Sequence, residues 1–158
     1  MVIVLSAALL LTVSNPPASS PRPQPIAVEV APKAQNPLAR EPLYADIVQR
    51  ANTLRTEVEA YRAAKSPATE ALPGFDRFKT DIAALSELDM KGHVDLAKRG
   101  TDGDLKCILK GISEDLAKKL AEVEQAKAPD TRATALEDMF YLLRDNIEVI
   151  TTLPTVQS

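Results

Sequence analysis

The strongest nucleophile in the sequence is its single cysteine, Cys107, which lies in the stretch DLKCILKG between Lys106 and Lys110. Nearby lysines favour the thiolate, the reactive form of the side chain. With one cysteine in the chain, an intramolecular disulfide is excluded. In an oxidising compartment a lone cysteine indicates an intermolecular disulfide or a free reactive thiol, whereas a buried cysteine packs as a small hydrophobic residue. Both interpretations stay open for Cys107.

The other groups that could do chemistry are few and poorly spaced. His93 is the single histidine and lacks the Glu-x-x-His spacing of di-iron bundles. Asp102 and Asp104 resemble calcium ligands, but the distal glutamate of an EF-hand loop is missing. Glu114 and Asp115 are adjacent, so their carboxylates diverge around a helix and form no acid–base pair. We therefore expect a protein that is not an enzyme, with no catalytic residue, metal or cofactor.

The charge and composition of the chain limit which partners and which fold class can be expected. The net charge is -3, and the basic residues between positions 91 and 110 alternate with aspartates and lack an aromatic side chain for base stacking. Nucleic acid is therefore not expected as a partner. The chain has 158 residues, 45% hydrophobic but only 4% aromatic, and alanine supplies much of the apolar fraction. This composition favours one all-α domain.

An uncharged apolar run, VIVLSAALLLTV, occupies residues 2–13. It is shorter than the roughly 20 residues that span a bilayer, and it is apolar on every side, unlike a core helix. We expect a signal peptide over residues 1–14 and a periplasmic or secreted protein. If it is not cleaved, the same segment would be a short membrane anchor, the only expected contact with a membrane.

Residues 15–42 are rich in proline, with eight prolines in the stretch NPPASSPRPQPIAVEVAPKAQNPLAREP. Each proline removes a backbone donor and biases the residue before it toward extended geometry. The sequence therefore predicts a disordered linker, or tether, over residues 15–42.

Helical periodicity begins directly after this linker. From Tyr44 to Tyr61, apolar residues recur at spacings of three and four, which predicts a helix over about 42–64 that packs nearly antiparallel in a bundle or coiled coil. A second helix is predicted over about 74–90. Gly92 is expected to interrupt it, leaving a short extra helix near 94–98. The apolar row of the second helix consists of Phe75, Phe78, Ile82, Leu85 and Leu88.

A third helix is predicted over about 104–127, with a kink or break near Gly111 as an alternative. Cys107 should point away from the core on a regular helix. A break at Gly111, or the short segment at 94–98 folding over that face, would instead bury the thiol. The row expected to be buried consists of Leu105, Ile108, Leu109, Ile112, Leu116, Leu120 and Val123.

The last helix is predicted over about 130–152 and is apolar on two sides. Its main row contains Leu136, Met139, Phe140, Leu143, Ile147 and Ile150. A second row, Ala135, Leu142 and Val149, lies more than a quarter turn away. Either this helix is central and packs against two neighbours, or the second row is a candidate face for a partner.

Together these elements predict an up-and-down four-helix bundle over residues 43–152, with a short extra helix near 94–98 and a tail over 153–158. We expect an exported bundle that acts by protein–protein interaction, either with a protein partner or as a homodimer. The alternative is a carrier of a small apolar ligand, held in a cavity between the helices. Its lining would come from Phe75, Phe78, Met139, Phe140 and Tyr141.

Overall fold

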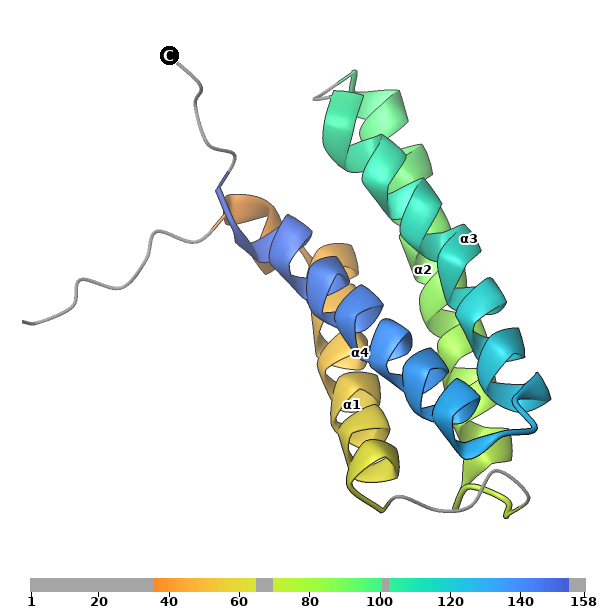
Figure 1. Ribbon diagram of the computed structural model, residues 1–158. Helices are drawn as coiled ribbons and strands as arrows, with labels where there is room; N and C mark the ends of the chain where they lie inside the picture. Colours follow the sequence, from red (N-terminus) through yellow and green to blue (C-terminus); the bar gives the residue numbers. More distant parts are fainter. Residues whose placement is uncertain (1–35, 65–69, 101–102, 154–158) are drawn as a thin grey trace, which may run out of the picture. The chain divides into compact units, whose positions relative to one another are not determined.

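The computed structural model describes residues 36–64, 70–100 and 103–153. Its elements are the 3-10 helix η1 (Pro37–Arg40) and the α-helices α1 (Pro42–Ala64), α2 (Phe75–Arg99), α3 (Gly103–Gln125) and α4 (Pro129–Thr151). Successive helices run antiparallel, and α1 packs against both α2 and α4 (Figure 1). The expected all-α fold, an up-and-down four-helix bundle, is confirmed. The expected signal peptide at 1–14 lies outside the described residues.

Helix α1 begins and ends where its apolar spacing predicts, at Pro42 and Ala64. Its apolar row is buried along the whole length, because spacings of three and four keep the side chains on one side of the helix. The row consists of Tyr44, Ile47, Ala51, Leu54, Val58 and Tyr61. It packs with buried residues of the other three helices in one continuous core.

The expected interruption of the second helix at Gly92 is wrong, and so is the separate short helix near 94–98. Helix α2 continues through Gly92 to Arg99 and ends at Gly100, which has a left-handed φ of 66°. Gly92 is buried, and a Cβ atom there would lie 3.0 Å from Leu109 Cδ1 and 3.4 Å from Tyr44 Cε1. This glycine therefore allows α1 and α3 to approach α2 closely and does not break the helix.

Helix α3 is likewise continuous across Gly111, so the alternative of a break at this position is wrong. Gly111 is half-buried, and a Cβ atom there would meet nothing within 4 Å. The two mid-helix glycines thus occupy opposite surroundings: Gly92 is enclosed by neighbours, whereas Gly111 faces open space.

Residues 36–41, expected to be the last part of a disordered linker, are ordered and include η1. Asn36 donates its backbone N–H to the Thr151 carbonyl (3.0 Å), and its side chain accepts from the Leu38 N–H (3.1 Å) at the start of η1. Leu38 and Ala39 pack against the core. Residues 36–41 therefore belong to the bundle, because a capped turn carries apolar side chains onto the end of α4.

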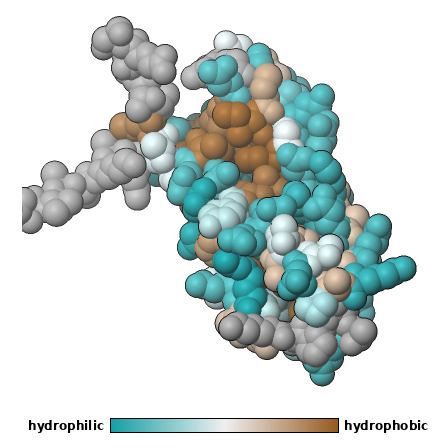
Figure 2. Space-filling model, viewed as in Figure 1, coloured by the Kyte–Doolittle hydropathy of each residue, from teal (hydrophilic) through white to brown (hydrophobic). Residues whose placement is uncertain are grey.

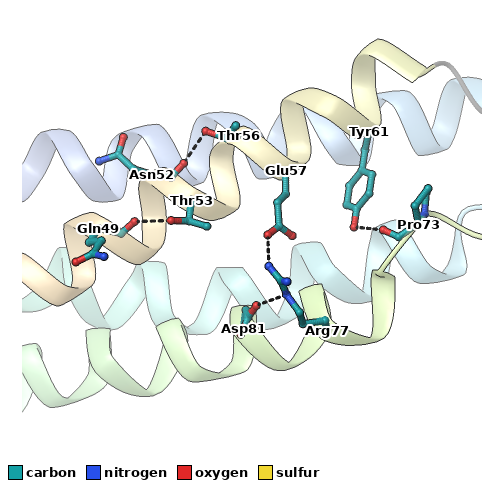
Figure 3. A network of polar contacts seen from close by, with 9 residues as sticks. All are labelled: Gln49, Asn52, Thr53, Thr56, Glu57, Tyr61, Pro73, Arg77 and Asp81. Atoms are coloured by element: carbon teal, nitrogen blue, oxygen red, sulfur yellow. Dashed lines mark hydrogen bonds and ion pairs between the residues drawn. The ribbon is translucent and has the colours of Figure 1, made fainter.

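Polar contacts also join α1 to α2 at the surface (Figure 3). Glu57 pairs with Arg77 (3.0 Å), which also contacts Asp81 (3.4 Å), while the Tyr61 hydroxyl donates to the Pro73 carbonyl (2.8 Å). The Arg77 side chain is 73% exposed, so its ion pairs contribute little to stability. The Tyr61 bond is the more restrictive contact because it holds the chain just before α2 against the end of α1.

Candidate functional site

The candidate reactive residues are separate in the structure. Cys107 is exposed on α3, so the alternative that it is buried is wrong: α2 and α3 are both continuous and leave the thiol uncovered. His93 is half-buried on α2, and its Nδ1–H donates to the Lys106 carbonyl (2.7 Å). This bond joins α2 to α3 and gives the imidazole a structural role.

The adjacent carboxylates Glu114 and Asp115 are both exposed on α3. Glu114 pairs with Lys110 at 3.7 Å, and Asp115 is exposed beside it. Within the described ranges, no three His, Cys, Asp or Glu side chains are grouped so that they could hold a metal ion. Also within those ranges, no helix is long and apolar enough to cross a membrane.

The large apolar residues suggested for a ligand cavity are spread over core and surface. Phe78 and Met139 are fully buried in the core. Phe140 lies under the guanidinium of Arg62 (4.8 Å to the ring centroid), and Tyr141 is 42% exposed. Phe140 and Tyr141 contact each other edge to face (5.7 Å between ring centroids), so the four side chains are divided between the core and a partly exposed pair.

The second apolar row of α4, Ala135, Leu142 and Val149, runs along the side of α4 that faces α3. Asp138, on the same side, pairs with Lys119 of α3 at 2.8 Å. Ala135 is buried near the α3–α4 connection, whereas Leu142 and Val149 are half-buried toward the other end. The row is therefore covered by α3 at one end only.

The Lys119–Asp138 pair fixes how residues of the two antiparallel helices lie opposite one another. Ile108 precedes Lys119 on α3 by the same number of residues as Val149 follows Asp138 on α4. At 1.5 Å per residue, Ile108 and Val149 therefore lie at the same level of the helix pair. Figure 2 shows apolar side chains gathered on this face where α3 begins and α4 ends, bordered by hydrophilic residues. We call this area the α3–α4 patch, defined by Leu105, Ile108, Leu142 and Val149.

Exposure is greatest at Ile108, whose side chain was expected to be buried with the rest of its row. It is 42% exposed, whereas Leu109 beside it is fully buried. The other three residues of the patch are half-buried and pack against the hydrophobic core: Leu105, Leu142 and Val149. The expectation that Ile108 is buried is wrong because α3 and α4 diverge from their short connection toward this end of the bundle (Figure 1).

Beyond the apolar side chains, the outer edges of the patch are acidic. On α3 the outer stripe is Asp104, Ile108, Gly111 and Asp115, and on α4 it is Asp138, Leu142, Asp145 and Val149. Both stripes have the spacing four, three, four, which keeps their members on one side of the helix. The four charged positions are all aspartate; Asp138 is paired with Lys119, and Asp145 with its neighbour Arg144 (2.8 Å).

A polar pair lies in the core between α2 and α4. Asn146 Nδ2 donates to Asp89 Oδ2 (2.9 Å), and both residues are fully buried. Asp89 Oδ1 and Asn146 Oδ1 have no hydrogen-bond partner. Burial raises the pKa of the Asp89 carboxyl to about 8, although the hydrogen bond from Asn146 acts in the opposite direction. Asp89 is therefore mostly protonated at neutral pH.

Sequence reasoning missed this pair, yet the spacing contains a signal for it. Asp89 continues the buried row of α2 at the position after Leu85, and Asn146 follows Leu143 in α4, with the same steps of three and four. A polar residue that occupies a position of the apolar row is often buried and forms a polar contact with a neighbouring helix. Such a contact favours one register of the two helices over others. Assigning residues to the buried row by their position alone, whatever their type, would have identified both Asp89 and Asn146.

The fold and this site define the class of the protein: an antiparallel four-helix bundle with an apolar patch, edged by aspartates, between two helices. No family model matches the chain, and neither a curated protein nor a solved structure shows significant similarity to it.

Proposed function

We propose that the chain is an exported, non-catalytic binding protein that holds a protein partner on the α3–α4 patch. Ile108 carries this proposal. Its side chain is 42% exposed. Helical spacing places it next to half-buried Leu105 on α3 and level with half-buried Val149 on α4. Covering such a cluster is favourable by about 25 cal/mol per Å² of apolar surface removed from water.

A single exposed apolar residue is ordinary, but a contiguous group is typical of an interaction site. Val94 provides the comparison within this chain. It is also β-branched and 42% exposed, but it lies on the outer side of α2 near Lys91 and Lys98. The two residues thus match in chemistry and exposure and differ in their surroundings.

The experiment that tests the proposal compares Ile108→Asp with Val94→Asp in the full chain. Cross-linking in the native host, followed by identification of bound proteins, should show partners that Ile108→Asp loses and Val94→Asp keeps. A drop of at least about tenfold in binding is expected, the effect of a residue central to an interface. Circular dichroism of both variants controls for folding. If both variants keep the same partners at the same level, the patch is not the binding site.

The proposed location outside the cytosol rests on the apolar run at residues 2–13. Fractionation of cells that produce the full chain should recover it in the periplasm or medium, and deletion of residues 2–13 should retain it in the cytosol. Recovery of the undeleted chain in the cytosol alone would contradict export.

A further inference from the structure

We infer that the α3–α4 patch receives an amphipathic helix of a different protein, one whose apolar stripe is bordered by lysine or arginine. This inference rests on the proposed function and adds the chemistry of the partner. Three features of the patch carry it: the charge of its edges, its shape along the bundle, and its mismatch with a second copy of the chain.

The charged residues of the two outer stripes are all acidic, although Asp138 and Asp145 already form ion pairs with Lys119 and Arg144. The outer stripes of α3 and α4 contain four aspartates and no lysine or arginine. The lysines of α3 on either side of Ile108, Lys106 and Lys110, are two residues away from it and so lie about 160° around the helix. Lys110 pairs there with Glu114. A partner with basic residues beside its apolar stripe would place cations next to Asp115 and Asp145, which gives specificity and faster association.

The shape of the patch suits a helix. Its apolar side chains lie in two rows with a widening space between them (Figure 1), on α3 from Leu105 to Ile112 and on α4 from Leu142 to Val149, each about 10 Å long. A third helix lying between the rows would contact both with residues spaced i, i+3, i+4 and i+7. Gly111 lies on the edge of the patch with open space in front of it, so a partner's backbone can approach α3 closely there.

A second copy of the chain does not fit the same patch. In a two-fold dimer each outer stripe would face an outer stripe of the other copy. Each copy would then bring its own aspartates, Asp115 and Asp145 among them, to a surface that is already acidic, and like charges across an interface disfavour association. Anionic membrane surfaces are disfavoured for the same reason. The edges therefore select against self-association and in favour of a basic partner.

The test uses two synthetic helical peptides of roughly four turns with leucines at i, i+3, i+4 and i+7. One has lysines beside the leucine stripe, and the other has glutamates at the same positions. Binding to the full chain is measured by fluorescence anisotropy. We expect the lysine peptide to bind at least about tenfold more tightly, and Ile108→Asp to lower its affinity by at least about tenfold while Val94→Asp does not.

A charge-matched pair of variants tests the edges themselves. Asp115→Asn with Asp145→Asn should lower the affinity of the lysine peptide several-fold. Glu59→Gln with Glu87→Gln removes the same charge from exposed positions on α1 and α2 and should leave the affinity nearly unchanged. An equal loss in both double variants would show attraction to net charge alone and would overturn the inference.

The remaining outcomes separate this inference from the proposed function. If the glutamate peptide binds equally well and still depends on Ile108, the patch docks helices but the basic partner is wrong. If neither peptide depends on Ile108, both the inference and the proposed function fail. If sedimentation velocity shows a dimer of the full chain that Ile108→Asp dissociates, the occupant is a second copy and the inference is overturned.

Discussion

Raising the pH from about 4 to about 8 is expected to lower the free energy of unfolding through one buried group, Asp89. Its pKa in the folded protein is about 8, against 3.8 for an ordinary aspartate. Between these values the folded state binds a proton that the unfolded state has released, so the contribution of Asp89 to stability is greatest below about pH 4 and falls as the pH rises. The slope reaches up to about 1.4 kcal/mol per pH unit.

The variant Asp89→Asn isolates this effect because asparagine mimics the protonated carboxyl in size and cannot ionise. We expect wild type and variant to differ little at about pH 4, and the variant to be more stable by roughly 3–5 kcal/mol at about pH 8. Urea unfolding followed by far-UV circular dichroism over this range measures the difference.

Asp76→Asn, in the same helix, is the matched control for the pH experiment. The Asp76 side chain is 99% exposed, so the same chemical change there should alter the pH dependence little. A difference between wild type and Asp89→Asn that stays constant across the range would show that the Asp89 carboxyl titrates normally, and the buried neutral pair would be wrong.

Gly92→Val is expected to destabilise the bundle by about 2 kcal/mol, although valine is the better helix former. A Cβ atom at position 92 would already lie 3.0 Å from Leu109 Cδ1, 3.4 Å from Tyr44 Cε1 and 3.5 Å from Ile47 Cδ1. The two further methyl groups of valine have no space unless α1 or α3 moves away from α2. Urea unfolding at constant pH measures the loss.

Gly111→Ala is expected to have the opposite effect on stability, although Gly111 also lies in the middle of a helix. No atom lies within 4 Å of a Cβ added at position 111, so alanine there meets no neighbour. Because alanine is favoured over glycine inside a helix, this variant should be more stable than the wild type by about 0.5–1 kcal/mol. Destabilisation by both variants to the same extent would contradict the different roles assigned to the two glycines.

The pattern of apolar residues was enough to predict the four helices and most of their core. Helix α1 was predicted over about 42–64 from the apolar row between Tyr44 and Tyr61, because each turn of a packed helix must place an apolar side chain toward its neighbours. This periodicity is a property of one segment, so it can be recognised without knowing what lies opposite. The row Ala135, Leu142 and Val149 was found in the same way, as a second side of α4.

The candidate site could be predicted only in part. The sequence indicated an extra apolar row on α4, but Ile108 opposite it was assigned to the core. Whether a residue of an amphipathic helix is covered depends on how far the neighbouring helix has diverged at that level. That distance is set by packing along the whole helix pair and leaves no trace in the local spacing.

The sequence by itself determined the helices, their apolar rows and the scarcity of reactive groups, because these follow from residue types and from the period of one helix. Only the tertiary structure decided that Gly92 is a close contact, that Asp89 meets Asn146 and that Cys107 and Ile108 stay exposed. Each of these depends on a neighbour from another helix, brought near when the four rows pack together.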